Sequence, residues 1–96
     1  MSNLQPWVSA EIRAEIGRQD LTRSQLSDRL AWHRMRIYRK LDNYSVLTVD
    51  ELDAIAEMLK VPAAELMRRA DEARACAAEA LNLEPAVYEH ALVGAA

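Results

Sequence analysis

One short stretch of the sequence concentrates the side chains that are best suited to binding a polyanion. Residues 18–40 hold seven basic and two acidic side chains, whereas residues 41–96 hold four basic and eleven acidic ones. Arginine presents a planar fork of N–H donors that matches phosphate oxygens and the O6 and N7 atoms of guanine. This local excess, within a chain of net charge −3, indicates either a polyanion-binding surface or a solvated helix face, and the placement of the arginines on helices decides between them.

Few residues of the chain are suited to catalysis or to metal binding. The two histidines, His33 and His90, are far apart in the sequence, and Cys76 has no histidine at helical spacing. The glycines are Gly17 and Gly94, so there is no glycine-rich loop to hold a phosphate. We therefore expect no catalytic residue, no metal site and no cofactor, and we do not expect an enzyme.

The composition favours helices as the elements that carry the basic side chains. The 96 residues are 51% hydrophobic but include no Phe, and most of the apolar residues are Ala and Leu. The chain has one Cys, no apolar run of 18 residues, and charged residues within its first 20. These features predict a small all-α protein of a reducing cytoplasm, without an intramolecular disulfide, a membrane span or a signal peptide.

Capping signals and apolar periodicity predict the order of the helices. Pro6 fits the first turn of a helix that ends near Gly17. Two capping boxes, TRSQ at residues 22–25 and TVDE at residues 48–51, mark the starts of two further helices. Between them, a short helix is expected from about residue 33 to residue 42.

The last third of the chain is predicted to be a long helix followed by a short one. Pro62 opens a helix with no stop signal before Asn82 or Pro85, and Pro85 permits one short final helix. The four-three spacing of a helix-packing seam is followed by Leu66, Ala70, Ala73, Ala77 and Ala80. This seam is suited to a partner helix or a second copy of the chain. The alternatives are that it folds back on the first helix or that it frays.

The two short helices after residue 21 are joined by a tight connection, which is typical of a helix-turn-helix. On the later of the two, Ile37 and Leu41 lie four residues apart and are expected to face the core. The opposite face then presents the side chains that are suited to base edges: His33, Arg34, Met35, Tyr38 and Arg39. Met35 offers an apolar contact for a thymine methyl group, and Arg36 and Lys40 lie on a flank that is suited to phosphates.

The sequence from Thr22 to Asn43, TRSQLSDRLAWHRMRIYRKLDN, resembles the helix-turn-helix of the lambda-repressor-like, Cro/CI-type (XRE) family. The following VLTVDELDAIAEMLKVPAAEL is similar to the fourth helix and the start of the fifth helix of that family, so the resemblance covers residues 21–67. It implies a five-helix all-α domain over residues 1–69, with a helical C-terminal extension over residues 70–96. Ala31 departs from the glycine that is common at the family's turn, and a positive φ there would cost roughly 1 kcal/mol or more.

The resemblance also implies roles for individual residues, because the family places the exposed face of its third helix in the major groove. Reading of bases is implied for His33, Arg34, Met35, Tyr38 and Arg39. Contacts to the DNA backbone are implied for Arg23, Arg36, Lys40 and Asn43. The alternatives are structural: Met35 as core filler, Tyr38 as a cover for the helix pair, and His33 as a weak helix cap.

The function implied by the resemblance is a sequence-specific double-stranded DNA-binding regulator of bacterial or phage type, which represses by occupying an operator. Two alternatives are an antitoxin of a toxin–antitoxin pair, which also binds a protein, and a phage excision or directionality factor. The expected partners are operator DNA, a second copy of the chain and a protein bound through the C-terminal helix, with no membrane. The expected location is the bacterial nucleoid or the cytoplasm of a phage-infected host.

Overall fold

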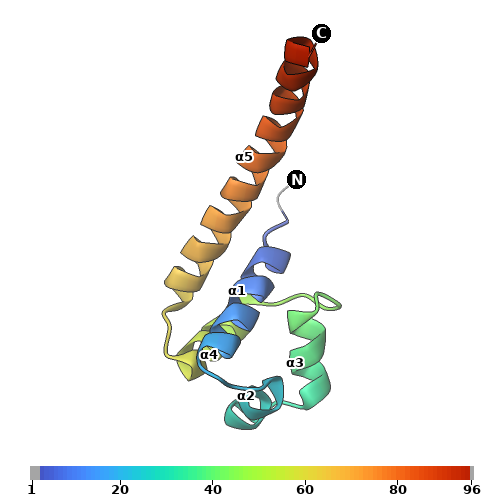
Figure 1. Cartoon of the computed structure of the whole chain (residues 1–96). Coiled ribbons are helices and arrows are strands. Elements are labelled where there is room, and N and C mark those ends of the chain that lie inside the picture. The colour runs from blue at the N-terminus through green and yellow to red at the C-terminus, as the bar shows by residue number, and fades with distance from the viewer. Residues whose placement is uncertain (1–2, 96) are drawn as a thin grey trace.

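The computed structural model describes the backbone of residues 3–95 and the side chains of residues 3–80. Over this range the chain forms five helices and no strand, which confirms the all-α prediction (Figure 1). The helices are α1 (Gln5–Arg18), α2 (Arg23–Leu30), α3 (Arg34–Leu41), α4 (Val49–Leu59) and α5 (Ala63–Ala95). None of these helices has both the length and the apolarity that are needed to cross a membrane.

Both predicted capping boxes are present and set the starts of α2 and α4. The Thr22 hydroxyl accepts the N–H of Gln25 at 3.1 Å, and the Gln25 side chain accepts the N–H of Thr22 at 2.8 Å. Thr48 and Glu51 form the same reciprocal pair, at 3.1 and 2.9 Å. These bonds satisfy backbone N–H groups that have no partner within the helix.

The prediction that Pro85 separates two helices is wrong. The segment Ala63–Ala95 is one continuous helix, and Pro85 lies inside it. A proline inside a helix costs about 3 kcal/mol, but the surrounding sequence is rich in Ala, Leu and Glu, which favour the helix on both sides. The side chains after residue 80, including that of His90, lie outside those that the structure describes.

The core contains residues from all five helices. The fully buried apolar side chains are Ile12, Leu26, Ile37, Leu41, Ile55, Leu59, Leu66 and Ala70. The predicted inward orientation of Ile37 and Leu41 is therefore confirmed, since both are 0% exposed. Trp32, in the connection between α2 and α3, packs against this core as a partly buried side chain.

The start of α5 folds back on α1, as one of the alternatives for the alanine seam predicts. Leu66 and Ala70 are buried, and the Arg69 guanidinium lies 2.9 Å from the Glu15 carboxylate of α1. The helix then continues beyond the other four, and the molecule measures 61 × 25 × 21 Å along its principal axes (Figure 1). A boundary between residues 69 and 70 would therefore fall inside a single helix.

The turn between α2 and α3 requires a left-handed residue, and that residue is Ala31. Its φ is 56° and its ψ is 35°. The N–H of Trp32 donates to the Ser27 carbonyl at 3.0 Å, and the Ser27 hydroxyl donates to the Trp32 carbonyl, so bonds across the turn hold this conformation. An L side chain in this region costs roughly 1–2 kcal/mol, whereas glycine adopts it freely.

Ala31→Gly is therefore expected to stabilise the protein. We expect a gain of about 1 kcal/mol, which corresponds to a Tm increase of about 4–8 °C for a domain of this size. The matched control is Ala14→Gly at an exposed position inside α1, which is expected to lower the stability by about 1 kcal/mol. Thermal melts followed by circular dichroism measure both changes, and a lower Tm for Ala31→Gly would show that the turn is not strained.

Candidate nucleic-acid interface

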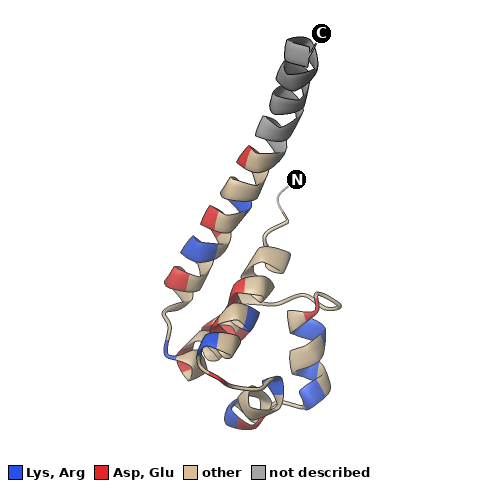
Figure 2. Ribbon diagram, in the orientation of Figure 1, with Lys and Arg blue, Asp and Glu red and all other residues tan. Residues whose placement is uncertain are grey.

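The burial of Ile37 and Leu41 leaves the other side of α3 in solvent. Met35 is 49% exposed and Tyr38 is 36% exposed, so neither is a core residue. The remaining predicted base-reading residues, His33, Arg34 and Arg39, are exposed as well, and the His33 Nδ1 atom accepts the N–H of Met35 at 3.2 Å, so His33 is the helix cap that the structural alternative predicts. Positions 34, 35, 38 and 39 share one face of a helix, and blue Lys and Arg positions follow α3 in Figure 2. The structure thus brings the predicted base-reading residues together on one exposed surface.

Two arginines of this surface have no acidic partner among the described side chains. No described carboxylate lies within 4 Å of the guanidinium of Arg34 or of Arg39. Their N–H donors are therefore available to an external acceptor. Of the predicted site residues, these two are the cations best suited to bind a ligand without first breaking an ion pair.

Arg36 and Lys40, on the flank of α3, are instead paired with Glu51 of α4. The Arg36 Nη2 atom lies 3.1 Å from Glu51 Oε2, and the Lys40 Nζ atom lies 3.1 Å from Glu51 Oε1. The Arg36 guanidinium also stacks on the Trp32 ring, 3.8 Å from its centroid, and Lys40 donates to the Val46 carbonyl. Both predicted phosphate-binding side chains are thus engaged within the protein.

Glu51 is a buried carboxylate that holds these two cations. Its side chain is 10% exposed. Burial alone would raise its pKa, but hydrogen bonds from the Thr48 backbone and from Lys40 and Arg36 outweigh that effect and lower the pKa to about 2. Its position in the first turn of α4, where the helix dipole favours negative charge, acts in the same direction. Glu51 is therefore ionised at neutral pH.

Glu51 is expected to make the fold sensitive to acid. Because its pKa is about 2 in the folded protein and 4.5 ordinarily, its contribution to stability is complete above about pH 4.5 and is lost as the pH falls toward 2. Thermal melts at pH 7, 4 and 3 should therefore show a smaller loss of Tm for Glu51→Gln than for the wild type. Glu15 and Glu65, whose pKa values are also lowered, contribute equally to both proteins.

The matched control for this pH series is Asp50→Asn. Asp50 is the exposed neighbour of Glu51 in the first turn of α4, and no described cation pairs with it. This variant should lose Tm with acid as steeply as the wild type does. An equal loss of Tm in Glu51→Gln would mean that the buried ion pairs do not contribute to acid sensitivity.

Arg23, at the start of α2, is predicted from the sequence to contact the DNA backbone. In the structure it bridges α2 and α3. Its Nη1 atom lies 2.9 Å from Asp42 Oδ1, and its guanidinium carbon lies 5.3 Å from the centroid of the Tyr38 ring. The cation–π contact and the ion pair together restrain Tyr38 on the exposed face of α3. A phosphate that binds Arg23 would have to compete with Asp42.

Asn43 ends α3 and ties it to α1. Its φ of 66° is in the left-handed region, which asparagine adopts more readily than most residues. Its Oδ1 atom accepts a hydrogen bond from the hydroxyl of Ser9 at 2.9 Å, and Ser9 is fully buried. The side-chain NH₂ group of Asn43 has no hydrogen-bond partner among the described residues, so it is the part of this exposed side chain that can reach an external acceptor.

Tyr44 belongs to the candidate interface, although it was not among the predicted site residues. It follows Asn43 in the loop before α4 and is 83% exposed. A hollow beside the exposed face of α3 is lined by Met35, Tyr38, Arg39, Asp42, Tyr44 and Ser45. In the sequence, the feature that indicates Tyr44 is its position directly after Asn43, where α3 ends.

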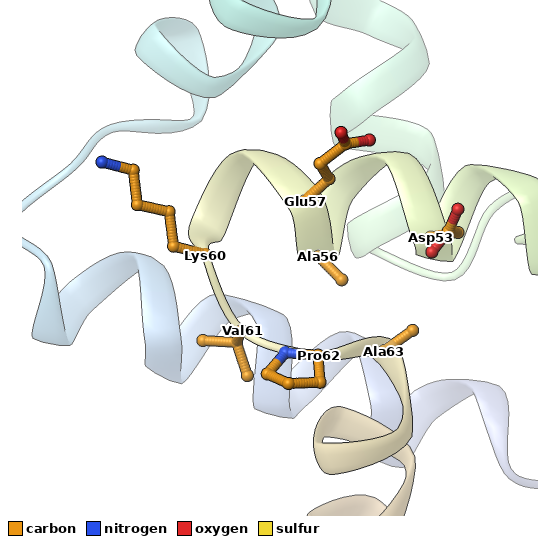
Figure 3. Close-up of a pocket in the computed structure, with 7 residues that line it drawn as sticks. All are labelled: Asp53, Ala56, Glu57, Lys60, Val61, Pro62 and Ala63. Atoms are coloured by element: carbon orange, nitrogen blue, oxygen red, sulfur yellow. The ribbon is translucent and has the colours of Figure 1, made fainter.

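A second hollow lies at the junction of α4 and α5 and contains none of the predicted site residues. Its lining is Asp53, Ala56, Glu57, Lys60, Val61, Pro62 and Ala63 (Figure 3). Asp53 and Glu57 outnumber the single cation of this lining, Lys60, so its side chains carry a net negative charge that does not favour a polyanion. The basic surface of α3 is therefore the stronger candidate for nucleic acid.

The chain matches no protein-family model, no curated protein and no solved structure. A functional assignment therefore depends on the residues and their geometry.

Proposed function

We propose that the protein is a sequence-specific double-stranded DNA-binding transcriptional regulator, with a lambda-repressor-like, Cro/CI-type helix-turn-helix formed by α2 and α3. The observation that carries this proposal is the orientation of α3. Ile37 and Leu41 are fully buried, whereas Arg34, at the first turn of the helix, and Arg39, on the opposite face, are exposed without a described acidic partner. With eight residues, α3 is about 12 Å long, a size that the major groove of B-DNA accommodates.

The side chains of the α3 face divide into two kinds of contact with DNA. Arg34 and Arg39 would donate to the O6 and N7 atoms of guanine, and Met35 would contact the methyl group of thymine. Arg23 and the N–H groups at the start of α2 would bind phosphates, which fix the register of the protein on the duplex. Binding of this kind represses transcription when the occupied site overlaps a promoter.

The length of α5 favours a second candidate function, in which the same DNA-binding protein also binds a protein, as an antitoxin does. Leu66 and Ala70 are buried at the start of α5, whereas Ala73 and Ala77 are half-buried and the helix continues to Ala95. A helix that outruns the core can pack against a second copy of the chain or another protein. Light scattering of the protein alone, and with the product of the neighbouring gene, separates these two partners.

Selection of duplexes from random DNA tests the proposed function. We expect one motif to be enriched, and we expect its affinity to exceed that of a scrambled duplex by about a thousandfold or more. A titration at several salt concentrations should give a log–log slope of about −0.9 for each phosphate contact. A palindromic motif would indicate a dimer with half-sites about 34 Å apart. Equal, weak binding to every duplex would contradict the proposal.

A further inference from the structure

The flank of α3 carries two cations that a buried carboxylate holds against the protein. Glu51 accepts from Arg36 at 3.1 Å and from Lys40 at 3.1 Å, so two positive charges share one negative charge. The Lys40 side chain is 16% exposed, and the Arg36 side chain is held on a second side by the Trp32 ring. Both cations lie within one helical turn of Arg39, on the same short helix.

Pairing with Glu51 limits what these two cations can offer to DNA. Sequence-independent affinity comes from Lys and Arg side chains that bind phosphates. For Lys40 to do so, its ammonium would have to leave a buried carboxylate, and Arg36 would have to turn its Nε and Nη2 donors away from the same group. Removing a partner from a buried charge is unfavourable. Arg34 and Arg39 carry no such restraint among the described residues.

We propose that Glu51 sets the sequence-independent DNA affinity of the protein by withholding Arg36 and Lys40 from the phosphates. This inference rests on the proposed function. It assigns to α4, which carries none of the predicted site residues, control over the electrostatic part of binding. It also gives Arg36 and Lys40, which are predicted from the sequence to contact the DNA backbone, a role other than binding phosphate.

Glu51→Gln in the full chain removes the negative charge that pairs with Arg36 and Lys40, and it leaves the helix cap in place. Gln25 already performs the same capping role at α2, where its side chain accepts the Thr22 N–H at 2.8 Å. The matched control is Asp50→Asn, which makes the same change of charge one residue away at an exposed position in no described ion pair. The dissociation constant of each protein is measured on an unrelated duplex over a range of salt concentrations, and a selected duplex serves as the check on base reading.

We expect Glu51→Gln to bind the unrelated duplex about 5- to 10-fold more tightly at 0.1 M salt for each cation released, with a log–log slope steeper by roughly 0.9–1.8. Asp50→Asn should change both quantities much less. Equal effects of the two variants would mean that only the overall charge matters, and weaker binding by Glu51→Gln would mean that Glu51 positions α3 instead. Either result overturns the inference while the proposed function stands.

Lys40→Gln provides a second test that does not depend on the stability of Glu51→Gln. If Glu51 withholds Lys40 from DNA, removing the Lys40 charge should leave the salt slope of the unrelated duplex unchanged. A slope that is flatter by about 0.9 would show that Lys40 binds a phosphate, which overturns the inference. A wild-type protein that binds neither duplex would instead reject the proposed function, and the inference with it.

Discussion

Replacing Arg39 with alanine is expected to weaken binding to the selected duplex by roughly 1–3 kcal/mol, which is about a 5- to 150-fold increase in Kd. The Arg39 guanidinium is exposed on the face of α3 opposite Ile37, and no described carboxylate competes for it. A bidentate contact with guanine is lost completely when the guanidinium is removed. The variant should therefore also lose its preference at one position of the motif, while its free energy of unfolding stays within about 0.5 kcal/mol of the wild-type value.

Arg29→Ala is the matched control for Arg39→Ala. Arg29 belongs to the same basic block, is exposed near the end of α2, and has no described acidic partner. Both variants lose one charge, so a purely electrostatic interaction would weaken equally in both. Competition titrations with duplexes that carry single base changes measure the two effects. Equal losses, or a loss that is the same for every duplex, would show that Arg39 reads no base.

The starts of the helices were predictable because capping is a local interaction. Thr22 with Gln25, and Thr48 with Glu51, lie three residues apart, so their reciprocal hydrogen bonds require nothing from the rest of the fold. The inward orientation of Ile37 and Leu41 was predictable for a related reason. These two aliphatic residues lie four positions apart on one face of α3, so a single orientation of the helix buries both.

The partners of the charged side chains were not predictable, because they come from different helices. Glu51 has the sequence signature of a helix cap, and nothing local shows that α4 brings it against Arg36 and Lys40. The ion pair between Arg23 and Asp42 likewise spans two helices. The sequence therefore does not distinguish an Arg or Lys side chain that faces solvent from one that pairs with a carboxylate of another helix.

At two positions the backbone adopts a conformation that the residue type itself disfavours, because the surrounding residues favour it. Lys60 adopts a φ of 59° at the end of α4, where a glycine would be the usual signal. Pro85, in contrast, is a strong stop signal that α5 overrides. In both cases the preference of one residue, worth about 1–3 kcal/mol, is smaller than the sum of the preferences and contacts around it.

The contacts of the buried face keep α3 folded, and they are therefore needed to present its exposed face. An isolated helix of eight residues is not stable in water, because so few hydrogen bonds do not offset the free-energy cost of nucleating the helix. Tertiary contacts must therefore hold α3. Ile37 and Leu41 supply the apolar part of these contacts. Polar contacts come from Glu51 to Lys40, from Ser9 to Asn43 and from Arg13 to the Leu41 carbonyl.

Ile37→Ala is accordingly expected to lower the free energy of unfolding by about 2–5 kcal/mol, a large fraction of the stability of a domain of this size. Ile37 is 0% exposed, so the substitution leaves a cavity between α3 and the core. Met35→Ala, on the exposed face of the same helix, is the control and should change stability by no more than about 0.5 kcal/mol. Urea denaturation followed by circular dichroism measures both. If the two losses were equal, or if Met35→Ala were the larger, α3 would be rotated from the orientation that exposes Arg34 and Arg39, and the proposed reading of DNA by this face would be wrong.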